Sequence, residues 1–280
     1  MRARDRGVGG GGAHHGGRWS RHDHVGPLIR FATRLLRVVP VGPVRTLARG
    51  IGSAAYYVLG ARRRTVLQSV AALRPTLGRA QQRRVARRTF GNLAAASVDL
   101  FRLPAATRDE LDRLVTVEGL EHLDHALSLG KGVLVVTAHL GAYELGGACL
   151  TARGYSTYAV VEDLSPEVYD ALASLRSATG MRLINLRNAI AGTYRALKEN
   201  AIVLLVADRV IGDRTRSLTV PFGAGWRDIP VGPASFAVST GAPIVIGFVC
   251  QAPAHSTARY IVHFDPRSRG LHLATTNVMR

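Results

Sequence analysis

The chain has 280 residues, which is enough for one large domain or two small ones. Hydrophobic residues make up 47% of it and charged residues 20%, which excludes a protein that is disordered throughout. Two cysteines exclude a disulfide scaffold, and no cysteine or histidine spacing fits a zinc site, so we expect no metal.

Most of the net charge of +18 lies in the first 102 residues, which contain 20 arginines, no lysine and three acids. Residues 103–280 are nearly neutral. This asymmetry predicts a basic front that meets a polyanion, either a nucleic acid or an anionic membrane surface. Nucleic-acid binding would favour aromatic side chains that stack on bases, but the few aromatics of the front fall mostly in apolar helix positions. We therefore expect an anionic membrane and no nucleic acid.

Residues 1–26 are glycine-rich, polar and basic, and they lack apolar periodicity. This composition predicts a disordered basic tail. It does not fit a secretory signal, because no apolar stretch follows the basic start.

Residues 27–102 form a basic amphipathic helical region in this interpretation. A helix over 27–39 would bring three arginines to one face, Arg30, Arg34 and Arg37. A second helix, over 44–60, would place Arg45 and Arg49 one turn apart. Such helices suit a bilayer surface, with apolar residues inserted and arginines at the headgroups, and the arginines interrupt both before they could span it. The alternative is that the helices pack on the body with solvated arginines.

Residues 103–280 show the strand–helix alternation of an α/β layered body with a mixed, mostly parallel sheet covered by helices. The uncharged stretch 230–258 is broken by proline and glycine, which favours a buried helix, a turn and the strand 244–250 over a membrane span. The other predicted elements are helices over 119–129, 165–180 and 188–199, and strands over 132–138, 156–161, 182–185 and 201–207.

Three polar residues stand just beyond the ends of predicted buried strands: His139, Glu162 and Asp208. In open α/β sheets, ligands collect at the carboxyl ends of the strands. Each residue alone has a structural explanation, as a turn cap or as an ion pair with a sequence neighbour. Together they predict a candidate site at one sheet edge.

His139 and Glu144 are five residues apart, a spacing that does not share a face of a regular helix. They can meet if His139 lies in the turn after the strand and Glu144 in the first turn of the next helix, and Gly141 permits that turn. The carboxylate would accept a hydrogen bond from one imidazole nitrogen, leaving the other to take a proton from a hydroxyl. The alternative is a structural turn histidine.

The block GVLVVTAHLGAYELGG (132–147) resembles the His-x4-Asp/Glu motif of bacterial glycolipid acyltransferases. These are the lipid A lauroyl/myristoyl acyltransferases and the related phosphatidylinositol mannoside acyltransferases, within the lysophospholipid-acyltransferase-like superfamily. The likeness extends over about residues 28–265 and is carried by the segments 62–70, 117–132, 158–180, 204–210 and 220–245.

The resemblance implies transfer of a fatty acyl group from a thioester, acyl-CoA or acyl carrier protein, to a hydroxyl of a membrane glycolipid, without metal or cofactor. It makes His139 the base and Glu144 the acid that orients it. It places four further residues on segments that line the donor or acceptor site: Glu162, Arg176, Asp208 and Arg209.

The resemblance also implies a peripheral enzyme at the cytoplasmic face of the inner membrane. Family members usually continue into a C-terminal helical segment with a Pro-x-x-Trp-like stretch, so we expect that helix to be missing here. A catalytically inactive membrane scaffold with the same fold is the alternative.

Overall fold

The structure is a computed structural model that describes residues 35–36, 39–162, 176, 179–211, 216–253 and 256–265. The predicted tail 1–26, nearly all of the predicted helix 27–39 with its three arginines, and nearly all of the predicted helix 165–180 lie outside these residues.

In the described part of the chain, a seven-stranded sheet has the order β1-β9-β8-β2-β5-β3-β4. All neighbours are parallel except β8 and β9, so β1 and β9 run opposite to the other five strands. The prediction of a mixed, mostly parallel sheet is confirmed. The strands are β1 (Val115–Glu118), β2 (Val133–Thr137), β3 (Thr157–Val161), β4 (Arg182–Asn185), β5 (Ile202–Val206), β8 (Ile244–Gln251) and β9 (Tyr260–Asp265).

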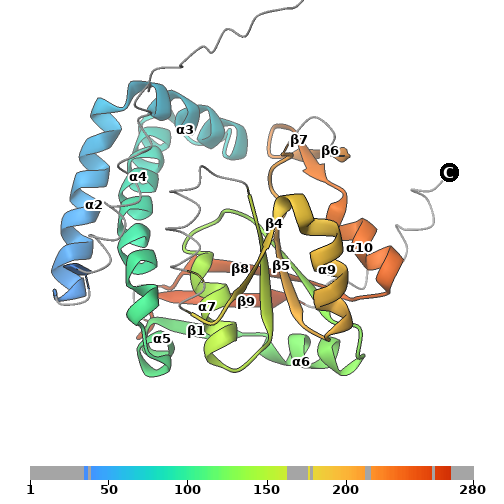
Figure 1. Ribbon diagram of the computed structural model, residues 1–280. Coiled ribbons are helices and arrows are strands. Elements are labelled where there is room, and N and C mark those ends of the chain that lie inside the picture. The colour runs from blue at the N-terminus through green and yellow to red at the C-terminus, as the bar shows by residue number, and fades with distance from the viewer. Residues whose placement is uncertain are drawn as a thin grey trace, which may run out of the picture.

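Helices cover both faces of this sheet, because its central strands are apolar on both sides. On one face, Val133 and Val135 of β2 pack in a core with α5 (Arg108–Leu114), α6 (Leu120–Ser128) and α7 (Glu144–Ala152). On the other face, Leu134 of β2 packs in a core with α9 (Ala189–Lys198) and α10 (Gly232–Thr240). Short 3-10 turns, η1 (Leu103–Ala105) and η2 (Leu186–Asn188), precede α5 and α9. Figure 1 shows the layers.

The uncharged stretch 230–258 contains α10, a turn and β8, as predicted. None of the helices in the described ranges combines the length and the apolar character that a membrane-spanning helix needs.

Sequence analysis missed four strands. β1 is only four residues long, and β9 buries Tyr260, Val262 and Phe264 in an alternating pattern that could have been recognised. The other two, β6 (Ser217–Phe222) and β7 (Gly225–Pro230), form an exposed hairpin of their own. Mostly exposed side chains and Pro221 inside β6 hid its strand pattern.

Among the elements whose bounds lie in the described ranges, α2 (Val41–Val58), α3 (Gly60–Leu73) and α4 (Arg79–Arg102) precede the α/β body. α4 lies between α2 and the sheet (Figure 1). α2 and α4 touch through glycines, since a Cβ added at Gly52 would lie 2.5 Å from the carbonyl oxygen of Phe90. A Cβ at Gly91 would lie 2.6 Å from Oγ of Ser53. The backbones therefore approach closely over this crossing.

Arg45 does not lie at the surface, where sequence analysis placed it. The side chain is buried, and it forms an ion pair with Asp99 of α4, Nε to Oδ1 2.5 Å. The other carboxylate oxygen, Oδ2, accepts a 2.6 Å hydrogen bond from the hydroxyl of Tyr260 in β9. The prediction for Arg45 is wrong because its partner lies 54 residues away, where spacing along α2 cannot reveal it.

This three-residue network should control the stability of the chain. Replacing Asp99 by Ala leaves the Arg45 guanidinium buried without a counter-charge, and we expect it to cost roughly 3–5 kcal/mol in the free energy of unfolding. The triple variant Arg45→Met, Asp99→Leu, Tyr260→Phe removes every member and should cost far less. Urea denaturation measures both. An Asp99→Ala variant as stable as wild type would contradict the prediction.

Candidate active site

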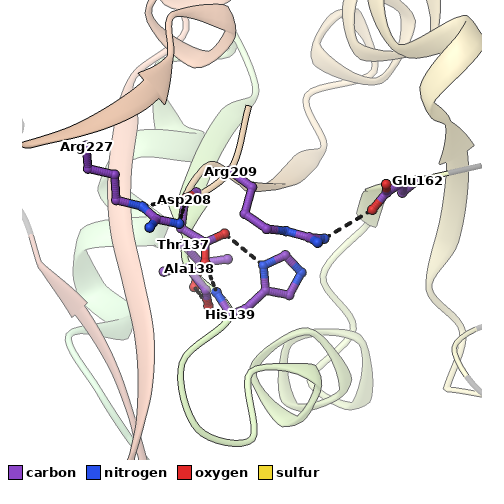
Figure 2. A network of polar contacts seen from close by, with 7 residues as sticks. All are labelled: Thr137, Ala138, His139, Glu162, Asp208, Arg209 and Arg227. Atoms are coloured by element: carbon purple, nitrogen blue, oxygen red, sulfur yellow. Dashed lines mark hydrogen bonds and ion pairs between the residues drawn. The ribbon is translucent and has the colours of Figure 1, made fainter. Parts of the chain in front are cut away.

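The sheet register brings the ends of β2, β5 and β3 together. Thr137, the last residue of β2, pairs with Val206, the last of β5, and the N–H of Ala207 donates to the carbonyl of Thr137 at 2.9 Å. β3 pairs in parallel on the other side of β5. His139, Asp208 and Glu162, which follow these three strands, therefore share one edge, as predicted (Figure 2).

His139 is held by Asp208 at two points. The backbone N–H of His139 donates to Oδ2 at 3.2 Å, and Nδ1 lies 2.7 Å from Oδ1. Burial alone would raise the pKa of Asp208, but the hydrogen bonds and the charge of His139 lower it below its usual value. An ionised carboxylate only accepts, so Nδ1 carries the hydrogen. In a neutral ring, Nε2 is then the proton acceptor.

The predicted hydrogen bond between His139 and Glu144 is wrong, since Asp208 takes the place at Nδ1. Glu144 begins α7 and receives Arg176 instead, Nε to Oε2 3.0 Å and Nη2 to Oε1 2.5 Å. Both side chains of this second pair are largely buried. Burial alone would lower the pKa of Arg176, but the hydrogen bonds and the charge of Glu144 raise it above its usual value.

The turn between β2 and α7 has the tight form that sequence analysis expected. Gly141 has φ +61°, and a Cβ there would lie 2.5 Å from the carbonyl oxygen of Val249. Tyr143, which was not predicted, packs edge-on against the imidazole of His139, with ring centres 5.1 Å apart. Burial and the Glu144 charge raise the pKa of Tyr143 to about 12, so its hydroxyl keeps its proton at neutral pH.

Two further arginines complete the polar edge. Arg209 donates to Oε2 of Glu162 at 3.1 Å, which joins the loops after β5 and β3. Arg227 of β7 donates from Nε, at 2.9 Å, and from Nη2, at 2.5 Å, to the backbone carbonyl of Asp208 (Figure 2). Sequence analysis missed Arg227 because it missed the hairpin that carries it.

These groups open onto a cavity of about 750 Å³, whose wall is mainly apolar. Five of the six sequence-predicted site residues line it: His139, Glu144, Glu162, Arg176 and Arg209. Asp208 stands behind His139. On the face of the sheet covered by α7, the cavity is lined by Met181, Leu204 and Val249. On the other face of the sheet, it is lined by Phe236 of α10.

The arrangement can do one kind of chemistry well: accept a proton at Nε2 of His139 beside a space that suits a hydrocarbon chain. Within the described ranges, no three histidine, cysteine, aspartate or glutamate side chains are grouped as a metal ion would need.

Comparison with known proteins agrees with this geometry. The family described as bacterial lipid A biosynthesis acyltransferase matches residues 25–280. A phosphatidylinositol mannoside acyltransferase of Mycobacterium tuberculosis is 33% identical over 155 residues, which are 52% of this chain and 48% of that protein. One from Mycolicibacterium smegmatis is 30% identical over 152 residues, 52% of this chain and 49% of that protein. The chain spans about half the length of these curated relatives.

The family match extends over more than nine-tenths of the sequence and includes the His139 turn, the Arg176 segment and the strand before Asp208. The chain belongs to the bacterial lipid A biosynthesis acyltransferase family.

Proposed function

We propose that this chain transfers a fatty acyl group from a thioester to a hydroxyl of a glycolipid at a membrane surface. The observation that carries the proposal is the His139–Asp208 pair at the mouth of a large apolar cavity. Family membership and the phosphatidylinositol mannoside acyltransferases among the relatives support a glycolipid acceptor. The family is described by lipid A biosynthesis, which supports a lipid A precursor as acceptor to the same extent as a phosphatidylinositol mannoside. We therefore propose a glycolipid acceptor of either type.

His139 acts as general base in this mechanism. Nε2 takes the proton of the acceptor hydroxyl as its oxygen attacks the thioester carbonyl, which forms the new C–O bond. Asp208 stabilises the imidazolium that results and keeps the ring oriented. When the C–S bond breaks, the imidazolium gives its proton to the leaving thiolate, so the enzyme returns to its starting state.

Glu144 keeps a place in the site, but with a different task from the one predicted. Its carboxylate fixes the Arg176 guanidinium beside the cavity, in a pair shielded from water. Arg176 is thereby a fixed positive group that can hold a polar part of the donor or acceptor. Glu162 and Arg209, which are more exposed, form the outer polar rim and are suited to sugar hydroxyls.

The donor would be acyl-CoA or acyl carrier protein, with its alkyl chain in the apolar cavity. Each buried methylene contributes about 0.8 kcal/mol, so such a cavity can hold a long chain firmly. The site residues provide the acid–base chemistry without a cofactor. The glycolipid acceptor and the arginine-rich front both favour work at an anionic membrane, and the resemblance to the family favours the cytoplasmic face of the inner membrane.

The first test removes the base. His139→Ala should lose about 10²–10⁴-fold in turnover, the usual contribution of a positioned general base. The fold should persist, because about a third of the side chain is exposed. Turnover is measured by mass spectrometry of acylated glycolipid, and Leu140→Ala, an exposed neighbour in the same turn, is the control.

Turnover of His139→Ala within a few-fold of wild type would refute the catalytic assignment. It would leave an inactive membrane scaffold or a structural histidine as the explanation.

The second test separates the two carboxylates. In a His139→Ala background, Asp208→Asn should cause no further loss of turnover, because Asp208 acts through the imidazole. Glu144→Gln in the same background should cause a further loss, because it releases Arg176 rather than the imidazole. The reverse pattern would show that Glu144, not Asp208, is the partner of the base during the reaction.

The third test concerns acyl-chain length. Met181 is buried, lines the cavity and packs beside Gly147, where an added Cβ would lie 2.3 Å from the Met181 methyl group. Met181→Phe should shift preference toward shorter acyl donors, and Met181→Ala toward longer ones. Product analysis with a mixture of donors measures the preference. The same chain-length distribution in both variants would place the acyl chain elsewhere.

A further inference from the structure

A second, basic cleft lies far along the chain from the candidate active site, between the end of α2 and the first turns of α4. It has a volume of about 510 Å³. Two tyrosines of α2, Tyr56 and Tyr57, form one side. Three arginines of α4 form the other: Arg83, Arg84 and Arg87. We call these five residues, with the adjoining Ala80 and Gln81, the arginine cleft.

Contacts between side chains hold part of the arginine cleft in place. The hydroxyl of Tyr57 accepts a 3.3 Å hydrogen bond from Nη1 of Arg87, which leaves its own hydrogen for another acceptor. Tyr56 is buried and edge-on to both Tyr57 and Phe90, so the ring wall is fixed. A fourth guanidinium, that of Arg63 in α3, lies 5.7 Å from the ring centre of Tyr56.

The part of the chain that forms the cleft supplies no acidic residue to balance its positive charge. Residues 24–98 contain no aspartate or glutamate at all. Within the described ranges, the acid of α4 is Asp99, and it is committed to Arg45 and Tyr260. The three guanidinium groups on the α4 side of the hollow repel one another, and an anion that entered the hollow would offset this repulsion.

The arginines of the cleft also lie in the first turns of α4, where the helix itself attracts anions. The helix begins at Arg79 with no acid in its first turn, although the partial positive charge of a helix N-terminus favours acids there. The missing acid is a departure from the usual pattern of a helix start, and such a departure beside a concave surface is typical of a binding site. Guanidinium groups match the oxygens of a phosphate, to which they can donate two parallel hydrogen bonds.

An exposed apolar strip on α2 indicates where such a phosphate comes from. Leu47, Ile51 and Val58 share one face of the helix and are 61–81% exposed. The strip ends at Val58, next to Tyr57 of the cleft, and α2 is the outermost helix of the front (Figure 1). A molecule with a phosphate head and alkyl chains would meet the cleft and the strip together, and tyrosine is enriched at that boundary in membranes.

We propose that the arginine cleft binds the phosphate of an anionic phospholipid headgroup, with the apolar strip of α2 entering the acyl region beside it. This is a specific site and not a diffuse attraction, so it should discriminate headgroup chemistry at equal surface charge. It does not depend on acyl transfer, and its test uses binding alone.

The experiment compares two vesicle types in a phosphate-free matrix of neutral digalactosyl diacylglycerol. One contains phosphatidylglycerol, and the other contains the same mole fraction of cholesteryl hemisuccinate, which carries a carboxylate. The full chain should partition at least tenfold more strongly to the phosphatidylglycerol vesicles. Equal partitioning to both would overturn the proposal, because a non-specific electrostatic attraction depends only on the surface charge of the vesicle and not on the chemistry of the headgroup.

Matched variants locate the preference. The cleft triple variant, Arg83→Gln, Arg84→Gln, Arg87→Gln, should lose the preference for phosphatidylglycerol. The control triple variant, Arg62→Gln, Arg64→Gln, Arg88→Gln, removes the same charge from exposed arginines outside the cleft and should keep it. Loss of the preference in both variants, or in neither, would overturn the proposal.

Two further measurements check that the variants are folded and that the ligand is a lipid. Thermal unfolding should show the cleft triple variant to be as stable as wild type, because these arginines are exposed and form no ion pair with an acid within the described residues. If it does not fold, Tyr57→Phe with Arg87→Lys, which keeps the charge, should still lower the preference severalfold, and an unchanged preference would refute the site. Soluble glycerol phosphate should compete with the vesicles; stabilisation by glycerol phosphate with no vesicle preference would overturn the assignment to lipid.

Discussion

One buried carboxylate, that of Asp99, joins the helical front of the chain to its α/β body. Asp99 lies on α4, accepts hydrogen bonds from Arg45 of α2, and accepts another from Tyr260 of β9. A buried charge is tolerated only when its partners satisfy it, so the three elements must meet at one relative position. Burial and the nearby carboxylate raise the pKa of Tyr260, so its hydroxyl remains a donor. The network fixes one contact of α2 and α4 with the sheet.

The same principle of pairing organises the candidate active site. His139 and Asp208 form one pair and Glu144 and Arg176 another, and both stand at the mouth of the same cavity. The imidazole of the first pair is about a third exposed, whereas both side chains of the second pair are largely buried. The site therefore combines a partly exposed imidazole with a fixed guanidinium. The apolar wall of the cavity behind them could bury an apolar group.

The sequence predicted the α/β layers and most of the central elements, because buried strands and helices have different apolar periods. It also placed His139, Glu162 and Asp208 at one edge, since parallel strands end together. It did not reveal which strands are neighbours. β2 lies beside β5 and not beside β3, so the partner of His139 comes from 69 residues away rather than from the adjoining turn. Arg45 was misplaced for the same reason, because burial depends on a distant acid. Exposed elements such as the β6–β7 hairpin carry too weak a pattern to be recognised.

The distances along the chain between paired elements have a consequence for biosynthesis. α2 and α4 can meet once residue 102 has emerged from the ribosome, because Arg45 and Asp99 both precede it. Tyr260 is synthesised far later, and until then the carboxylate of Asp99 lacks its second partner. A ribosome that has completed the helical front therefore carries a helix pair that is not yet fastened to the body. The front and the body can be joined through Tyr260 only after both have been synthesised, so the chain exposes its basic front before its large apolar cavity can form.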